Sequence, residues 1–268
     1  MAHHNRLSNA RVLVFGGTSG IGFGVASMAI SNGANVIISG SKQPKVDEKV
    51  ALLRSLYPDV PANKITGHAL DLLEIEKLEA GALETYFDSV TQHGDNKIDH
   101  IAFTAGDTFS ASTVIETMTA ETAMHGFKVR YLVPLLIAKS LVKNPGKYMP
   151  VSNATSISLT GGTNTQKPMP GWSIRAGQGG AVEALSRGLA VDLSPIRVNL
   201  VEPGAVQTEL LDAVFKSSSP EVLENMKNGW LTGAFGRPED LAEAYGWFMK
   251  DQFVTGVIAS SNGGRMLK

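Results

Sequence analysis

The sequence predicts an α/β fold in which a doubly wound parallel sheet is covered by helices on both faces. Two patterns indicate this fold: short apolar segments alternate with segments of helical length, and a glycine-rich turn joins the first strand to the first helix. With 268 residues and no break in composition, we expect residues 1–268 to form a single domain. The expected strands are residues 12–15, 36–38, 65–70, 98–103, 156–160, 197–201 and 256–260.

The expected helices lie between these strands. The first covers residues 21–32 and stops at Asn32-Gly33, a common helix end. The second covers about 45–57 and stops before Pro58, because the residue before a proline disfavours helical geometry. Further helical segments are expected at 72–93, 119–143, 172–193, about 209–215, about 221–229 and from 238 onward.

The composition argues against several classes of function. A net charge of -1 gives no basic field for nucleic acid, and the absence of cysteine removes disulfides, thiolate catalysis and thiolate metal sites. The histidines show no metal-ligand spacing, so we expect no metal. No apolar run reaches membrane-spanning length and no signal segment precedes the first strand, so we expect a soluble, cytoplasmic protein without a membrane partner.

The glycine-rich turn has the pattern of a phosphate cradle. Gly16 permits the tight turn, Gly20 lets the backbone approach a pyrophosphate, and Gly22 lets helix and strand pack closely. The helix that follows directs its N-terminal N–H groups and partial positive charge toward the ligand. We therefore expect a dinucleotide to be contacted by Gly16, Thr18, Ser19, Gly20 and Ile21.

Other candidate ligand residues fall at the carboxyl ends of strands, where α/β sheets bind ligands. After the second strand, Ser41 and Lys42 stand where an acidic residue would select NAD(H); they favour NADP(H), although Lys42 is alternatively a solvated loop lysine. Asp71, beside Leu72, is a candidate acceptor for the adenine amino group or the N-cap of the next helix. The small run Thr104, Ala105 and Gly106 lets the backbone lie flat against a cofactor.

Together these motifs resemble the short-chain dehydrogenase/reductase superfamily over nearly the whole chain. Residues 15–22 match its Thr-Gly-x-x-x-Gly-x-Gly loop, with Phe15 in place of the threonine, and residues 103–106 stand where the family has Asn-Asn-Ala-Gly. Residues 236–242, 255–256 and 263–264 match its C-terminal segment. The resemblance implies a Rossmann-type sheet of about seven strands, a nicotinamide cofactor, and cofactor contacts from Pro203, Gly204, Val206 and Thr208.

The catalytic positions of that family are changed in this chain. Alignment without gaps places Arg175 at the family tyrosine, Gly179 at the lysine, Gly162 at the serine and Arg130 at the helix asparagine. Glycine neither donates a proton nor holds a ribose, and arginine is a poor general acid. We therefore do not expect ketone reduction by the ordinary family mechanism, although a ketone reductase with a non-standard active site remains an alternative.

An iminium carbon accepts hydride without a proton donor, and the chain resembles a fungal branch of the superfamily with that chemistry. This branch comprises the reductase/Diels-Alderases of malbrancheamide- and paraherquamide-type indole alkaloid biosynthesis, in which NADPH reduces an iminium before an intramolecular cycloaddition. The branch has an arginine at Arg130 and Asp-Lys-Pro where this chain has Gln166-Lys167-Pro168. The resemblance implies an NADP(H)-dependent reductase of fungal secondary metabolism, with Arg130, Gln166 and Arg175 as candidate catalytic residues.

A second hypothesis is a dinucleotide-binding regulator or non-redox protein that kept the fold and lost the chemistry. Met169 and Trp172 are candidates to enclose an apolar, indole-type substrate, or are ordinary lid and core residues. Arg130 has apolar neighbours, so we expect it to face cofactor or substrate; Arg175 faces the site or turns to solvent. Relatives assemble through two long helices, here 119–143 and 172–193, so the resemblance implies a homodimer or homotetramer.

Overall fold

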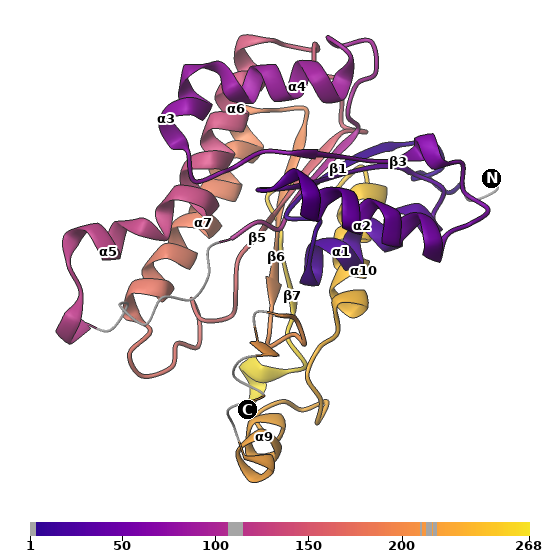
Figure 1. Ribbon diagram of the computed structural model, residues 1–268. Coiled ribbons are helices and arrows are strands. Elements are labelled where there is room, and N and C mark those ends of the chain that lie inside the picture. The colour runs from indigo at the N-terminus through magenta and orange to yellow at the C-terminus, as the bar shows by residue number, and fades with distance from the viewer. Residues whose placement is uncertain (1–3, 107–114, 210, 213–215, 217–218) are drawn as a thin grey trace.

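The computed structural model describes residues 4–106, 115–209, 211–212, 216 and 219–268. In these residues, seven parallel strands form one sheet with the order β3-β2-β1-β4-β5-β6-β7 (Figure 1). The α/β fold predicted from the sequence, with its doubly wound parallel sheet, is confirmed. The strands are β1 (Arg11–Phe15), β2 (Asn35–Gly40), β3 (Ile65–Ala69), β4 (His100–Phe103), β5 (Ser156–Thr160), β6 (Arg197–Pro203) and β7 (Ile258–Ser261).

The centre of the sheet is where its winding direction changes. β1 pairs with β2 on one side and with β4 on the other, so that Phe15 lies in register with both Ser39 and Phe103. Both faces of β1 are covered, which is why its sequence from Val12 to Phe15 is apolar and does not alternate. In sheets of this topology, the crevice beyond the carboxyl ends of the strands at the change of direction is the ligand site.

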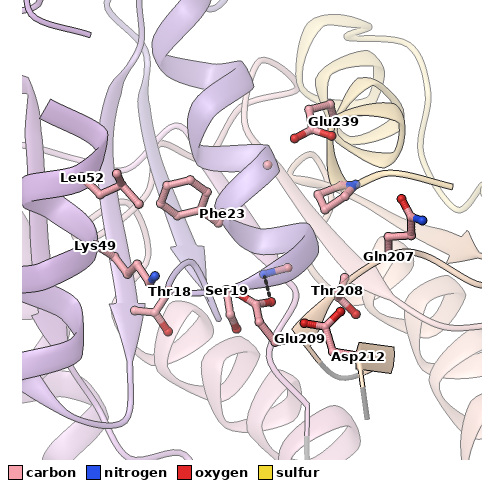
Figure 2. Close-up of a pocket in the computed structure, with 13 residues that line it drawn as sticks. Thr18, Ser19, Phe23, Lys49, Leu52, Gln207, Thr208, Glu209, Asp212 and Glu239 are labelled. Atoms are coloured by element: carbon pink, nitrogen blue, oxygen red, sulfur yellow. Dashed lines mark hydrogen bonds between the residues drawn. The ribbon is translucent and has the colours of Figure 1, made fainter. Parts of the chain in front are cut away.

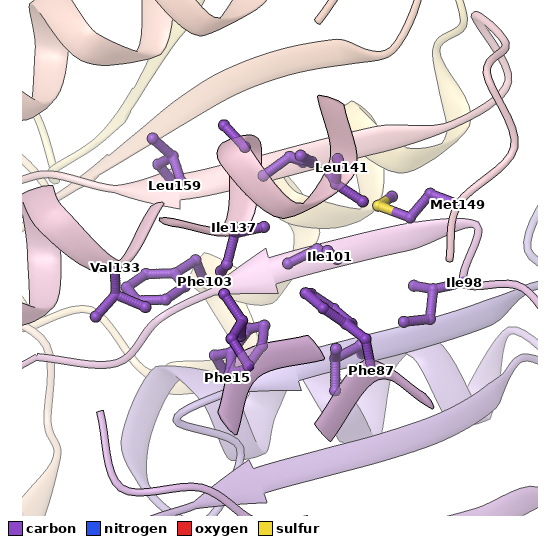
Figure 3. Close-up of a cluster of buried hydrophobic side chains, with 14 of the residues drawn as sticks. Phe15, Phe87, Ile98, Ile101, Phe103, Val133, Ile137, Leu141, Met149 and Leu159 are labelled. Carbon is purple, nitrogen blue, oxygen red and sulfur yellow. The ribbon is translucent and has the colours of Figure 1, made fainter. Parts of the chain in front are cut away.

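Helices cover both faces of the sheet (Figure 1). α1 (Gly20–Ser31), α2 (Gln43–Leu56) and α10 (Pro238–Lys250) lie on one face. α4 (Leu83–Thr91), α6 (Val133–Lys143) and α7 (Ser173–Asp192) lie on the other. Figure 3 shows the core of this second face, where Phe87 of α4 and Ile137 of α6 pack toward Phe103 of β4. Each helix buries one apolar face, which gives the two-sided core that the alternating sequence predicts.

The segment 119–143 is not the single helix expected from the sequence. It consists of α5 (Ala120–His125), which begins with a capping box at Thr119, a π-helical turn η5 (Lys128–Leu132), and α6. Pro134 has no N–H to donate to the carbonyl four residues earlier, which belongs to Arg130. The break therefore has a local cause, and it occurs at the candidate site residue Arg130.

The segment 72–93 is also interrupted. It comprises α3 (Ile75–Lys77), a π-helical turn η2 (Leu78–Ala82) and α4, with Gly81 at a φ of 119° in η2. Asp71 is not the N-cap that the sequence allowed, because the helix begins at Ile75 after Glu74; its Oδ1 instead accepts a hydrogen bond from the Leu73 amide at 3.0 Å.

The remaining elements are short. α9 (Pro220–Lys227) confirms the helix expected near 221–229, whereas the one expected near 209–215 lies partly outside the described residues. β7 starts two residues later than predicted. The described residues also include three single turns of 3₁₀ helix: η1 (Ala62–Lys64), η4 (Ile115–Thr117) and η6 (Arg265–Leu267). Of the helices described, none is long and apolar enough to cross a membrane.

Candidate functional site

The glycine-rich turn is built so that backbone alone faces the crevice. Gly16 has a φ of 81°, and a Cβ placed on it would lie 2.7 Å from the Ala105 amide nitrogen. Gly20 has a φ of 47°, and its Cβ would lie 2.9 Å from Thr208 Cγ2. A Cβ on Gly22 would collide with the Gly16 carbonyl oxygen. These three positions therefore exclude any larger residue, and the turn fits the pyrophosphate of a dinucleotide.

The end of β4 forms the other wall of this turn. The amide and the Oγ1 of Thr104 both donate to the Phe15 carbonyl oxygen, at 2.9 and 2.8 Å. A Cβ on Gly106 would lie 2.5 Å from Arg130 Nε. The small residues at 104–106 thus let Arg130 lie directly against the backbone that follows β4.

A cavity of about 540 Å³ opens at the N-terminus of α1 (Figure 2). Thr18 and Ser19 line it from the turn, and Lys49 of α2 points toward Thr18. Ser41 and Lys42, expected from the sequence to hold a 2'-phosphate, are exposed and do not line this cavity. Lys49 could not be predicted as a ligand residue from the sequence, because it lies in the second turn of α2, away from any motif. Only the fold brings it beside Thr18.

A carboxylate lies at the N-terminus of α1, the place where this fold binds the phosphates of a ligand. The Gly20 amide, at the N-terminus of α1, donates to Glu209 Oε2 at 3.0 Å (Figure 2). Asp212 and Glu239 line the same cavity. Because a helix N-terminus binds phosphate through these same N–H groups, a pyrophosphate at Gly20 requires Glu209 to move away.

Arg130 lies at the carboxyl ends of β4 and β5. It is half-buried, and its Nη1 is 3.5 Å from the Thr160 carbonyl oxygen and 3.4 Å from that of Gly161. These are long contacts, so the guanidinium is held near the strand ends by packing against Gly106 as much as by hydrogen bonds.

Arg175 contacts an aromatic ring in the neighbouring loop. Its guanidinium carbon lies 5.9 Å from the centre of the Trp172 ring, within the range of a cation–π interaction. Trp172 is half-buried and Met169 is 42% exposed. Arg175 thus contacts Trp172, one of the two residues expected from the sequence to enclose a substrate.

The loop after β5 packs closely against α7 beside Gly179. A Cβ on Gly179 would lie 3.2 Å from Thr165 Cγ2, and a Cβ on Gly162 would lie 2.6 Å from Asn164 Oδ1. Thr165 Oγ1 also donates to the Gly162 carbonyl oxygen at 2.7 Å, which fixes the loop in this position. Gly162 and Gly179 therefore let the loop pack closely onto α7.

Glu202 is a site residue that the sequence analysis did not identify. It is 0% exposed, and its Oε2 accepts hydrogen bonds from Gln166 Nε2 at 3.2 Å and from Ser260 Oγ at 2.8 Å. Burial, together with the neighbouring Glu183 carboxyl, raises the pKa of Glu202 to about 7. The available signal was a carboxylate in a buried strand, which is rare without a partner.

Comparison with models of protein families shows the family to which this chain belongs. An SDR-like Rossmann domain model matches residues 3–268, so the chain belongs to the short-chain dehydrogenase/reductase family of oxidoreductases. The Rossmann domain of this family binds a nicotinamide dinucleotide, and the glycine turn described above fits one.

Individual relatives show which members of the family this chain is similar to. The chain is 38% identical to the short-chain dehydrogenase/reductase malC of Malbranchea aurantiaca over 263 residues, which is 98% of this chain and 96% of the relative. The solved structure of the MalC reductase/Diels-Alderase superimposes with a TM-score of 0.87, covering 99% of this chain and 100% of that one.

A second relative, ucsE of an Acremonium species, is 34% identical over 98% of this chain and 97% of its own. A Brucella melitensis glucose/ribitol dehydrogenase structure, at 18% identity and a TM-score of 0.80, covers 96% of this chain and 97% of its own and shares the fold. The predicted resemblance to fungal reductase/Diels-Alderases is confirmed by the similarity to MalC.

Proposed function

We propose that the protein is an NADP(H)-dependent reductase of a cationic C=N bond in fungal secondary metabolism, and that the reduced product undergoes an intramolecular Diels-Alder cycloaddition in the same pocket. One observation carries this proposal: the dinucleotide cradle is intact while the family's proton-delivering positions are Gly162, Arg175 and Gly179. A hydride acceptor that is already cationic needs no proton donor. The similarity to the MalC reductase/Diels-Alderase supports the same chemistry.

The nicotinamide cofactor would supply the hydride, and the residues of this chain would hold and orient it. The phosphate end would be bound by the cradle, with Lys49 adding a positive charge beside Thr18. Ser41 and Lys42, at the end of β2, remain the candidates for a 2'-phosphate, which supports NADP(H) over NAD(H). The further candidate contacts are Ile21, Asp71, Leu72, Thr104, Ala105, Gly106, Arg130, Pro203, Gly204, Val206 and Thr208.

The substrate end would lie between Arg130 and the loop that precedes α7. Arg130 lies at the ends of β4 and β5, and Trp172 offers a half-buried ring for an indole-type substrate. Gln166 is exposed on its outer side and anchored to Glu202 on its inner side. In this arrangement the protein contributes orientation and shape to the reaction more than acid catalysis.

Spectrophotometry of NADPH at 340 nm tests the proposal. We expect stoichiometric loss of NADPH with an indole-type iminium and little loss with ketones. Tight NADP(H) binding without oxidation by any candidate would favour the dinucleotide-binding regulator, and rapid ketone reduction would favour a non-standard ketone reductase. A stereoselective conversion of pre-reduced diene without NADPH, faster than in buffer, would isolate the cycloaddition.

We also propose that the chain forms a homodimer or homotetramer in the cytoplasm. Apolar side chains are exposed on the helices through which relatives assemble: Leu132 in η5 is 37% exposed, Val142 in α6 is 62% exposed, and Val191 in α7 is 75% exposed. Burying them in an interface between copies is favourable. Light scattering of the purified chain measures this assembly, and a monomer at micromolar concentration would contradict it.

A further inference from the structure

A buried carboxyl group and a half-buried one lie behind Gln166, and we propose that this pair supplies the negative charge toward a cationic substrate that the Gln166 amide lacks. The pair consists of Glu202 near the end of β6 and Glu183 in α7. The inference rests on the proposed function, since it concerns how this site attracts an iminium.

Glu202 lies beside the end of β5. A Cβ on Gly161, at the end of β5, would lie 3.6 Å from Glu202 Cγ. Glu202 is fully buried, whereas Gln166 is exposed and donates through Nε2 to Glu202 Oε2 at 3.2 Å. Because the nitrogen and oxygen of an amide point in different directions, the Gln166 Oε1 is turned away from Glu202. The amide thus links a buried carboxyl group to the open side of the loop.

The two carboxyl groups act as a unit. Glu183 lies close enough to Glu202 to raise the pKa of its carboxyl, and the Oε1 atom of each is buried without a hydrogen-bond partner in the part of the chain that the structure describes. One proton held between the two side chains satisfies both atoms, and the pair then carries a single negative charge. A lone buried carboxylate would lack this partner for its second oxygen.

The positive groups on the surrounding elements are directed at backbone carbonyls. Arg130 Nη1 approaches the Thr160 and Gly161 carbonyl oxygens from η5. Lys167 Nζ donates to the Arg265 carbonyl oxygen at 3.0 Å, and Arg265 Nη2 donates to that of Lys167 at 2.9 Å. The charge of the pair therefore acts on the open side of the loop through Gln166.

Glu202 is a positioning residue, since it contacts Gln166 and Ser260 and acts on the substrate through the amide. Two consequences are measurable. A cation should bind better than a neutral molecule of the same shape, by about tenfold for one partly screened charge. This preference should increase as Glu202 loses its proton near neutral pH, because the pair then gains a second negative charge.

Calorimetry with two matched probes tests the inference on the full chain, with and without saturating NADP+. The probes are N,N,N-trimethyltryptammonium and its neutral carbon isostere, 3-(3,3-dimethylbutyl)indole. We expect wild type to prefer the cation by about tenfold at pH 7, with a preference that increases between pH 6 and 8. Glu202→Gln leaves the single charge of Glu183, so it should remove the increase with pH and reduce the preference severalfold at pH 8, where wild type carries the second charge. Glu76→Gln, which removes an exposed carboxylate from α3, should leave the preference and its pH dependence unchanged.

A double variant separates charge from folding. The double variant Gln166→Glu/Glu202→Gln exchanges the amide and the carboxylate, so that the carboxylate lies at the exposed position 166 and a hydrogen bond between the two positions is kept. It should therefore restore the cation preference. Equal binding of the two probes by wild type from pH 6 to 8 would overturn the inference, and this result does not depend on whether Glu202→Gln folds. An unchanged cation preference in a folded Glu202→Gln would also overturn it. A clear cation preference without NADPH oxidation by any iminium would support this inference and count against the proposed reductase.

Discussion

Removal of the Glu209 carboxylate should strengthen dinucleotide binding. This side chain accepts a hydrogen bond from the Gly20 amide, at the N-terminus of α1, over 3.0 Å. A pyrophosphate needs the same N–H group, so binding must first break this contact and then tolerate a like charge nearby. Glu209→Gln removes the charge, and Glu209→Ala removes the contact as well.

The size of the effect follows from the position of the side chain. A hydrogen bond to a charged group contributes roughly 1.5–3 kcal/mol. Glu209 is exposed, however, and exposed charged contacts contribute about 0.2–1 kcal/mol. We therefore expect about 1 kcal/mol, which corresponds to an affinity for NADP(H) about fivefold tighter in Glu209→Ala. Screening should shrink the difference as salt is raised from 10 mM toward 1 M.

Isothermal titration calorimetry of NADP+ and NADPH measures this difference. Glu239→Gln is the matched control, because Glu239 lines the same cavity but lies in α10 and contacts Arg237 in place of Gly20. We expect that control to change affinity by less than twofold. Weaker or unchanged binding in both Glu209 variants would refute the idea that this carboxylate competes with the pyrophosphate.

Three further outcomes are expected. Lys49→Ala should weaken NADPH binding by about threefold to tenfold, measured by fluorescence titration, whereas Lys143→Ala on α6 should not. Gly179→Lys should lower the melting temperature, because the new side chain must displace Thr165 and the loop from α7; equal stability would contradict the packing described here. Because folding raises the pKa of Glu202 to about 7, this group stabilises the fold at acidic pH, and its contribution should be lost as pH rises from about 4.5 to 7. Urea unfolding at pH 5 and 7 should detect the loss in wild type and a smaller one in Glu202→Gln.

Much of the fold follows from local sequence signals. Short apolar runs between turn residues predicted the strands. β5 was predicted at its observed bounds because Gly161 and Gly162 follow it directly. The long segments 72–93 and 119–143 were predicted less well. Periodicity cannot show a break that arises from one residue, such as Gly81 with its positive φ or Pro134 with its missing N–H.

The candidate site shows the same division between local and long-range information. The cradle is a continuous motif, so its position could be read from residues 16–22. Glu202 and Gln166 are 36 residues apart, and their contact exists only because the loop after β5 folds over α7. Glu209 and Gly20 are 189 residues apart. Contacts across such separations carry no signal in a single sequence, which is why the acidic groups of the site emerged only with the structure.

The central claim is that an electron-poor acceptor replaces the lost proton donor, and single-turnover NADPH oxidation tests it most directly. The enzyme loaded with NADPH is mixed with an indole-type iminium and with a ketone of matched size, and absorbance at 340 nm is followed. We expect one equivalent of NADPH to be consumed with the iminium, at a rate at least a hundredfold above that with the ketone, as the loss of a general acid worth about 10²–10⁴ implies. Equal rates with both acceptors, or no oxidation by either, would contradict the claim.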